Sequence, residues 1–184
     1  MKSLALKISM AVLSMIPLVA KAELIVLASP QSNDAYYAKM IDDIFDFHVD
    51  YAKKIIKNGD NVVVLTDKGL YPDYVKALGK KHVAIAPMHD IWMRDFTSAN
   101  PAQPVMFRYT AAGQGGAKKG QAISDEVQDE FKYYSQKAGL QFTQSKLLND
   151  GGNWVEDGYG NVVLSTKFLA DNKLTESEAR KKLM

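Results

Sequence analysis

The amino-acid sequence predicts an α/β fold of one domain, or of part of one. Short apolar and β-branched runs alternate with segments of helical period over residues 24–86. The 184 residues, 47% hydrophobic and 24% charged, have the composition of a globular protein. The chain contains no cysteine, which excludes a disulfide scaffold, a thiolate metal site and a cysteine nucleophile within these residues.

Three continuous apolar runs predict the first strands. Leu24–Ala28 is apolar at every position and is ended by Ser29 and Pro30. Asn61–Thr66 is rich in valine, and His82–Ala86 stops at a proline. Because such runs have no polar face, we expect strands that are covered on both sides.

Two helices are expected between these strands. Apolar residues recur at three- and four-residue spacings over Asp34–Asn58, which places them on one helical face. Ser32 or Asn33 can cap the start, and Gly59 follows the end. A short helix is predicted over Pro72–Gly79, with a proline in its first turn and a glycine at its end.

The second half of the chain repeats the alternation. We expect a strand over Val105–Thr110, a flexible loop over Gly113–Gly120, a helix over Ser124–Gly139 and a strand over Leu140–Leu148. A hairpin is then predicted around the turn Asp157–Gly160.

The chain ends in a further predicted helix. Thr175–Glu178 has the pattern of a capping box, which announces a helix that runs to residue 184. A helix this short is marginal unless it packs against other elements.

The N-terminal segment predicts a secretory signal peptide over residues 1–22. A basic stretch, Met1–Lys7, precedes the uncharged run Ile8–Ala20, and Ala20 and Ala22 match the small residues before a cleavage site. The run is shorter than the roughly 20 residues of a membrane span, so we expect no stable membrane anchor; the alternative is an uncleaved N-terminal anchor. Residues 23–184 would form the exported domain, periplasmic or secreted.

The charge of the chain argues against a nucleic-acid partner. Lys2, Lys7 and Lys21 lie in the predicted signal peptide, so the remaining chain is close to neutral although the whole carries a formal +2. A near-neutral chain without long basic runs has no general attraction for nucleic acid. The oligomeric state is left open.

The first candidate site is the polar and aromatic segment Asp90–Asp95 (DIWMRD), which follows a predicted strand. Ligands of α/β folds commonly bind at the carboxyl ends of strands. A carboxylate there can bind a guanidinium in two-pronged fashion, and the indole of Trp92 can pack on its flat face. In the structural alternative, Arg94 pairs with Asp90 or Asp95 and holds a loop, while Trp92 fills the core.

The second candidate site is Asp150–Asn153 (DGGN). Its two glycines permit a tight turn and a close approach of the backbone to a ligand, while Asp150 offers a carboxylate and Asn153 an amide. A plain loop before the hairpin is the alternative. His48, His82 and His89 have no metal-binding spacing, and a phosphate-binding loop is absent, so we expect neither a metal nor a cofactor.

Taken together, the two segments resemble the agmatine deiminase and bacterial peptidylarginine deiminase family, guanidine-modifying enzymes with the pentein α/β-propeller fold. Asp90–Phe96 is similar to the family pattern D-x-W-x-R-D-(F/Y), and Asp150–Asn153 to (D/E)-G-G-(N/S). Glu156–Gly158, Leu164–Thr166 and Asn172 continue the second match. The resemblance covers nearly all of residues 23–184 but only the N-terminal half of a family member.

The resemblance implies roles for single residues. Asp95 would be the guanidinium-binding carboxylate, Trp92 would line the pocket, and Arg94 would orient the site. Further substrate-binding candidates are Asp90, Asp150, Gly151, Asn153 and Arg108, the last of which would reach a substrate carboxylate. The implied fold is a partial propeller of two to three of five ββαβ modules.

The resemblance also implies a chemistry that this chain lacks in part. In the family a cysteine thiolate attacks the guanidinium carbon, a histidine acts as acid and base, and ammonia leaves. The family's cysteine and H-x-D motif lie in the C-terminal half, so the resemblance implies that this chain is a truncated family member, and we expect it to be inactive alone. The substrate would be peptidyl-arginine or agmatine, a precursor of putrescine, and export favours a compound outside the cytoplasm. The alternative function is a non-catalytic exported module that binds guanidino cations or a partner.

Overall fold

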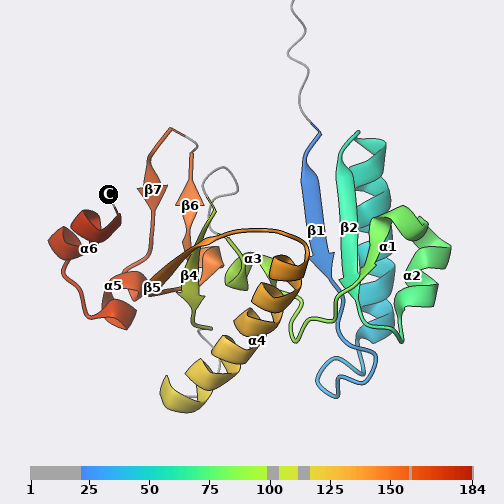
Figure 1. Cartoon of the computed structure of the whole chain (residues 1–184), viewed down its shortest axis with the longest axis horizontal. Helices are drawn as coiled ribbons and strands as arrows, with labels where there is room; N and C mark the ends of the chain where they lie inside the picture. Colours follow the sequence, from blue (N-terminus) through green and yellow to red (C-terminus); the bar gives the residue numbers. More distant parts are fainter. Residues whose placement is uncertain (1–21, 99–103, 112–116, 158, 184) are drawn as a thin grey trace, which may run out of the picture.

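The structure is a computed structural model that describes residues 22–98, 104–111, 117–157 and 159–183 and has a mixed α/β fold (Figure 1). The predicted signal peptide therefore lies outside the described residues except for Ala22. The elements in chain order are β1 (Leu24–Ala28), α1 (Ile41–Lys57), β2 (Asn61–Thr66), α2 (Tyr71–Leu78), η1 (Lys80–His82), β3 (Val83–Ile85), α3 (Met93–Phe96), β4 (Val105–Tyr109), α4 (Ala117–Lys137), β5 (Thr143–Asn149), η2 (Gly151–Asn153), β6 (Val155–Glu156), β7 (Val162–Val163), α5 (Lys167–Asn172) and α6 (Glu176–Leu183).

The first half forms a parallel sheet of three strands in the order β1-β2-β3. The helices α1 and α2 cover it on one side (Figure 1). Val64 and Tyr74 are fully buried between them, with Phe45 packed against this cluster. The predicted strands Leu24–Ala28 and Asn61–Thr66 are confirmed, and the third is shorter than predicted because His82 belongs to the turn η1.

The predicted start of the first helix at Asp34 is wrong. α1 begins at Ile41, and no side chain caps its N-terminus. Ser32, one of the two expected caps, instead donates through its backbone N–H and its hydroxyl to Oδ2 of Asp67, at 2.9 and 2.5 Å. This long-range pair ties the loop after β1 to the loop after β2. Residues 35–40 form turns before the chain enters α1.

The predicted start of the helix Ser124–Gly139 is also wrong. α4 begins at Ala117, so Gly120 lies in the helix and not in the expected loop, whose residues 113–116 fall outside the described part of the chain. Ser124 is buried in mid-helix, where its hydroxyl donates to the carbonyl of Gly120 (3.0 Å) and accepts from the N–H of Ala111 (3.1 Å).

The second half contains two small sheets. The strands β4 and β5 are parallel, with a register shift between Met106 and Arg108, and β6 and β7 form the expected antiparallel hairpin. The predicted capping box is confirmed, because Thr175 and Glu178 bond reciprocally at the start of α6. The short helix α5 is an additional element.

The two halves share a core that lies beneath α3. Its buried residues come from β1, the loop after β3, α3, β4 and α4: Ala28, Ala86, Met88, Phe96, Met106, Tyr109, Val127 and Phe131. Burial of these side chains fixes α3 between the sheets. A second cluster packs α5 and α6 against β4. No helix in the described ranges is long and apolar enough to cross a membrane.

Candidate functional site

The two sequence segments singled out as candidates meet in the structure. α3 follows β3 and η2 follows β5, and the helix and the turn contact each other. The contact requires glycine: a Cβ atom on Gly151 would lie 1.8 Å from the carbonyl oxygen of Arg94. A Cβ atom on Gly152 would lie 3.0 Å from Asp95 Oδ1 and 3.1 Å from Asp150 Oδ1. The glycine pair therefore serves the approach of these two segments.

Asp95 and Asp150 lie on either side of one hydrogen-bond donor. The backbone N–H of Gly152 donates to Asp150 Oδ1 at 2.8 Å and to Asp95 Oδ1 at 3.1 Å. Partial burial, and next the charge of Asp150, raise the pKa of Asp95 to about 6, although the Gly152 N–H opposes the shift. Two carboxylates so close together repel each other, and a cation placed between them relieves that repulsion.

Asp90 belongs to the same region but is held by other partners. Its Oδ1 accepts from the hydroxyl of Tyr37 at 2.8 Å and from the N–H of Ile91 at 2.7 Å. Tyr37 is buried, and its pKa is raised by that burial and by the hydrogen bond to Asp90. Asp90 also raises the pKa of Asp95, which places the two charges within electrostatic reach.

Tyr109 is a site neighbour that the sequence analysis missed. It ends β4 beside Asn149 of β5, the residue before Asp150, and it is 3% exposed. Its pKa is raised by burial and then by the charges of Asp90, Asp95 and Asp150. No motif marks Tyr109 in the sequence. Its position depends on the register of β4 against β5, which strand patterns do not specify.

The residues flanking the aspartates are placed differently from the structural alternative. Trp92 is 61% exposed and so does not fill the core. The guanidinium of Arg94 donates to the carbonyl oxygen of Trp154 at 2.7 Å, and not to Asp90 or Asp95. Arg94 therefore ties the first motif to the residue that directly follows the second one.

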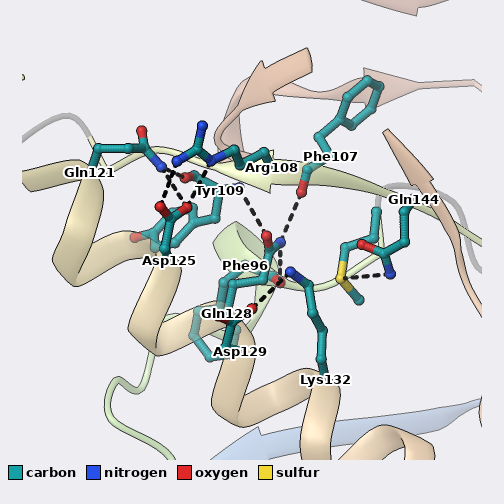
Figure 2. A network of polar contacts seen from close by, with 11 residues as sticks. Phe96, Phe107, Arg108, Tyr109, Gln121, Asp125, Gln128, Asp129, Lys132 and Gln144 are labelled. Carbon is teal, nitrogen blue, oxygen red and sulfur yellow. Dashed lines mark hydrogen bonds and ion pairs between the residues drawn. The ribbon is translucent and has the colours of Figure 1, made fainter. Parts of the chain in front are cut away.

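The side chains of the two remaining candidates, Arg108 and Asn153, form hydrogen bonds with residues other than Asp95 and Asp150. Arg108 donates from Nε and Nη2 to the two carboxylate oxygens of Asp125 at 2.8 and 2.6 Å (Figure 2). This pairing raises the pKa of Arg108. Asn153 accepts from the N–H of Ser165 at 2.9 Å and donates to Asn149 Oδ1 at 3.2 Å, so its amide connects η2 to the segment before α5.

The arrangement can hold a cation that carries several N–H donors. Ionised carboxylates only accept hydrogen bonds, and a planar guanidinium presents paired donors that match them. Within the described ranges, no group of three His, Asp or Glu side chains is arranged to hold a metal ion. The exposed indole of Trp92 offers a flat face close in sequence to these carboxylates.

The solved structures that this chain resembles include agmatine deiminases and a protein proposed to be a peptidyl-arginine deiminase. The agmatine deiminase of C. jejuni matches with a TM-score of 0.63 and 16% identity, over 88% of this chain and 49% of that one. A protein proposed to be a peptidyl-arginine deiminase matches with a TM-score of 0.66 and 18% identity, over 89% and 50%. The agmatine deiminase of Enterococcus faecalis matches with a TM-score of 0.59 and 16% identity, over 88% and 47%.

These likenesses show the mixed α/β fold and its extent. The chain spans about half the length of the solved structures that it matches. The count of two to three propeller modules stays a prediction.

No curated protein sequence gives a significant match. The model of one family, described as Porphyromonas-type peptidyl-arginine deiminase, matches residues 14–184. Since this match takes in both aspartate motifs and nearly the whole sequence, the chain belongs to the Porphyromonas-type peptidyl-arginine deiminase family.

Proposed function

We propose that this chain supplies the cation-binding carboxylates of an enzyme that hydrolytically deiminates a guanidino group. The observation that carries the proposal is the pair Asp95 and Asp150 on the single N–H of Gly152. One donor cannot satisfy two carboxylates, each of which has about four acceptor positions. A guanidinium brings the additional donors and the positive charge that the pair lacks.

The proposed division of labour follows from the chemistry of deimination. A thiolate adds to the guanidinium carbon and ammonia leaves with a proton; water then displaces the sulfur, which leaves a ureido oxygen on carbon. Asp95 and Asp150 would orient the planar cation and offset its charge through both steps. Because the chain has no cysteine, it would bind the substrate without turning it over.

Two substrate classes fit the carboxylate pair, and the pair itself does not distinguish them. A solved C. jejuni agmatine deiminase holds its bound substrate, which favours a small guanidino compound for that protein. We propose peptidyl-arginine for this chain, since residues 1–22 predict export and the exposed Trp92 leaves the region open to a larger ligand. The terminal guanidino group is common to both.

Calorimetric titration tests the proposal with agmatine and with the amide of acetyl-arginine. Binding by the wild-type chain and its loss in Asp95→Asn are expected, with no ammonia released in either case. Lys54→Gln is the matched control, because Lys54 is an exposed residue that pairs with Asp50 on α1. Absence of heat from a folded wild-type chain with both ligands would contradict the proposal.

The second candidate is a non-catalytic exported module that binds guanidino cations or a protein partner. The absence of cysteine favours it. A hybrid separates the two functions: the chain is fused to the C-terminal half of a solved agmatine deiminase, which contributes the nucleophile. If the hybrid releases ammonia and the ureido product, and the release depends on Asp95, the result supports the first proposal, that this chain is part of a deiminating enzyme. A folded hybrid that binds the ligand without product supports the binding module.

A further inference from the structure

The helix that carries Asp95 is too short to hold its own position. α3 consists of the four residues Met93–Phe96, and no side chain caps its N-terminus. One turn of helix is unstable without external contacts, and its last carbonyl groups need partners from elsewhere in the fold. The position of the Asp95 carboxylate must therefore be set by residues outside α3.

Gln128 of α4 supplies such a contact to the last residue of α3. Its Nε2 donates to the carbonyl oxygen of Phe96 at 3.1 Å and to that of Phe107 at 2.8 Å. Its Oε1 accepts from the N–H of Tyr109 at 3.1 Å. Figure 2 shows this single amide between α3, β4 and α4, where Gln128 is 1% exposed.

The three partners explain why a glutamine stands at this position. All three are backbone groups, so their donor and acceptor roles fix the orientation of the amide. A charged glutamate could not donate to the two carbonyl groups, and methionine or leucine would leave three buried polar groups unpaired. An asparagine is one methylene shorter. The three contacts therefore need both the amino group and the carbonyl oxygen of a glutamine side chain.

We propose that Gln128 is the positioning residue of Asp95: it anchors the carbonyl of Phe96, the next residue, and thereby fixes the carboxylate against Gly152 and Asp150. The proposal rests on the proposed function in so far as the bound cation is a guanidino group. Gln128 lies outside both motifs. Its bond to Tyr109 connects the same amide to the other buried neighbour of the aspartates.

The test compares Gln128→Met with Ser124→Ala in the full chain. Ser124 is the matched control, because it is a buried polar residue of α4 that bonds the backbone of Ala111 but not α3. The pKa of Asp95 is followed by NMR of carboxyl carbons, and agmatine binding by calorimetry. Gln128→Met is expected to move the Asp95 pKa from about 6 toward its ordinary range. It should also weaken binding roughly tenfold or more, as for other misplaced site groups.

The outcomes separate this inference from the proposed function. An Asp95 pKa that is unchanged in folded Gln128→Met would overturn the positioning role, whatever the ligand data. If that pKa moves but the wild-type chain binds no guanidino ligand, the positioning role stands and the proposed function fails. A shift of the same size in Ser124→Ala would also overturn the role, because it would reflect a general loosening of α4.

A measurement on the wild-type chain keeps the test decisive if Gln128→Met does not fold. The two Nε2 hydrogens of Gln128 should give separate NMR signals that exchange slowly, since both are donated to buried carbonyl groups. Their shifts should follow the titration of Asp95 through about pH 6. Gln136, an exposed residue of the same helix, should show neither property. Signals of Gln128 that behave like those of Gln136 would contradict the inference.

Discussion

Asp95 and Asp150 accept hydrogen bonds from the same donor, the backbone N–H of Gly152, although they are 55 residues apart in the sequence. The geometry brings two negative charges together where α3 contacts η2, just beyond the carboxyl end of β5. Partial burial, and next the charge of Asp150, raise the pKa of Asp95. Under the proposed function, a proton and a guanidinium would therefore compete for the same place.

The first prediction concerns the pH dependence of ligand binding. Since the pKa of Asp95 is about 6, the affinity for agmatine should rise with pH through 6 and then level off. Well below that pKa it should fall about tenfold per pH unit, because a proton must be displaced. Calorimetry in buffers of different ionisation enthalpy should show proton release on binding at pH 5.5. Asp95→Asn should bind weakly at every pH; an affinity of the wild-type chain that is flat from pH 5 to 8 would contradict the prediction.

The second prediction concerns stability. A carboxyl whose pKa is raised in the folded state stabilises the fold below its unfolded pKa and loses that contribution as the pH rises through about 6. Asp95→Asn removes this loss, so it should raise the Tm at pH 7 relative to the wild type and have little effect at pH 4. Thermal unfolding followed by circular dichroism measures both. Asp171→Asn, which removes a partner of Lys167 on α5, should show no such gain at pH 7.

The third prediction concerns the glycine that permits the two motifs to meet. Gly151→Ala should destabilise the chain by about 1–3 kcal/mol, because the new Cβ would overlap the backbone of Arg94 and force the segments apart. It should also lower the pKa of Asp95 toward its ordinary range. Gly160→Ala is the control: its Cβ meets no atom within 4 Å, so only its φ of +92° opposes the change. Equal effects of the two substitutions on the Asp95 pKa would contradict the structure.

The elements that were predicted correctly are those with a strong local pattern. β1 and β2 match their predicted bounds because each is a continuous apolar run between clear breakers. The start of α1 was missed because Ser32 bonds Asp67, a partner that a local capping rule cannot foresee. The start of α4 was missed because glycines favour a loop over residues 113–120, although the helix includes Gly120.

The candidate site was foreseen in its residues more than in its geometry. The resemblance pointed to Asp95 and Asp150, and the structure brings them together. Tyr109 and Gln128 were missed because their places depend on the register of β4 and on the packing of α4, which a single sequence does not encode in any short motif. Arg108 was expected near the ligand, but its charge is engaged by Asp125.

The fourth prediction concerns the buried pair His48 and Tyr74. Nδ1 of His48 lies 3.1 Å from the hydroxyl of Tyr74, and burial lowers the pKa of His48 to about 4. In the unfolded chain His48 has a pKa near 6.5, so on acidification it takes up a proton before the folded chain does. The stability of the fold therefore falls as the pH drops from 6.5 and stops falling below 4. The loss should reach about 3 kcal/mol.

Urea unfolding at a series of pH values checks the His48 prediction. His48→Gln keeps a hydrogen-bonding group for Tyr74 but does not titrate, so its stability should decline less than that of the wild type between pH 6.5 and 4. His89→Gln is the control, because that side chain is 42% exposed and faces Glu126 and Glu130 at 3.7 Å. Parallel stability profiles for the wild type and His48→Gln would contradict the prediction.

The last prediction concerns the N-terminal segment, for which we propose export and cleavage after Ala22. The carbonyl of Glu23 accepts from the N–H of Asn61 at 2.8 Å, so the sheet pairing begins directly after the proposed cleavage point. The N–H of Glu23 donates to Asp60 Oδ1 at 3.1 Å. Cleavage would turn this nitrogen into a charged amino group beside that carboxylate, which preserves the contact.

Intact-mass measurement of the exported protein should therefore find a chain that begins at Glu23. Ala22→Arg should block processing, because the cleavage site requires a small residue there, whereas Lys21→Gln should be cleaved normally. The cleaved chain should unfold at the same temperature as a chain expressed from Glu23, since the first strand keeps its partners on β2. Mature protein that still carries Met1, or that begins inside β1, would rule out this cleavage site.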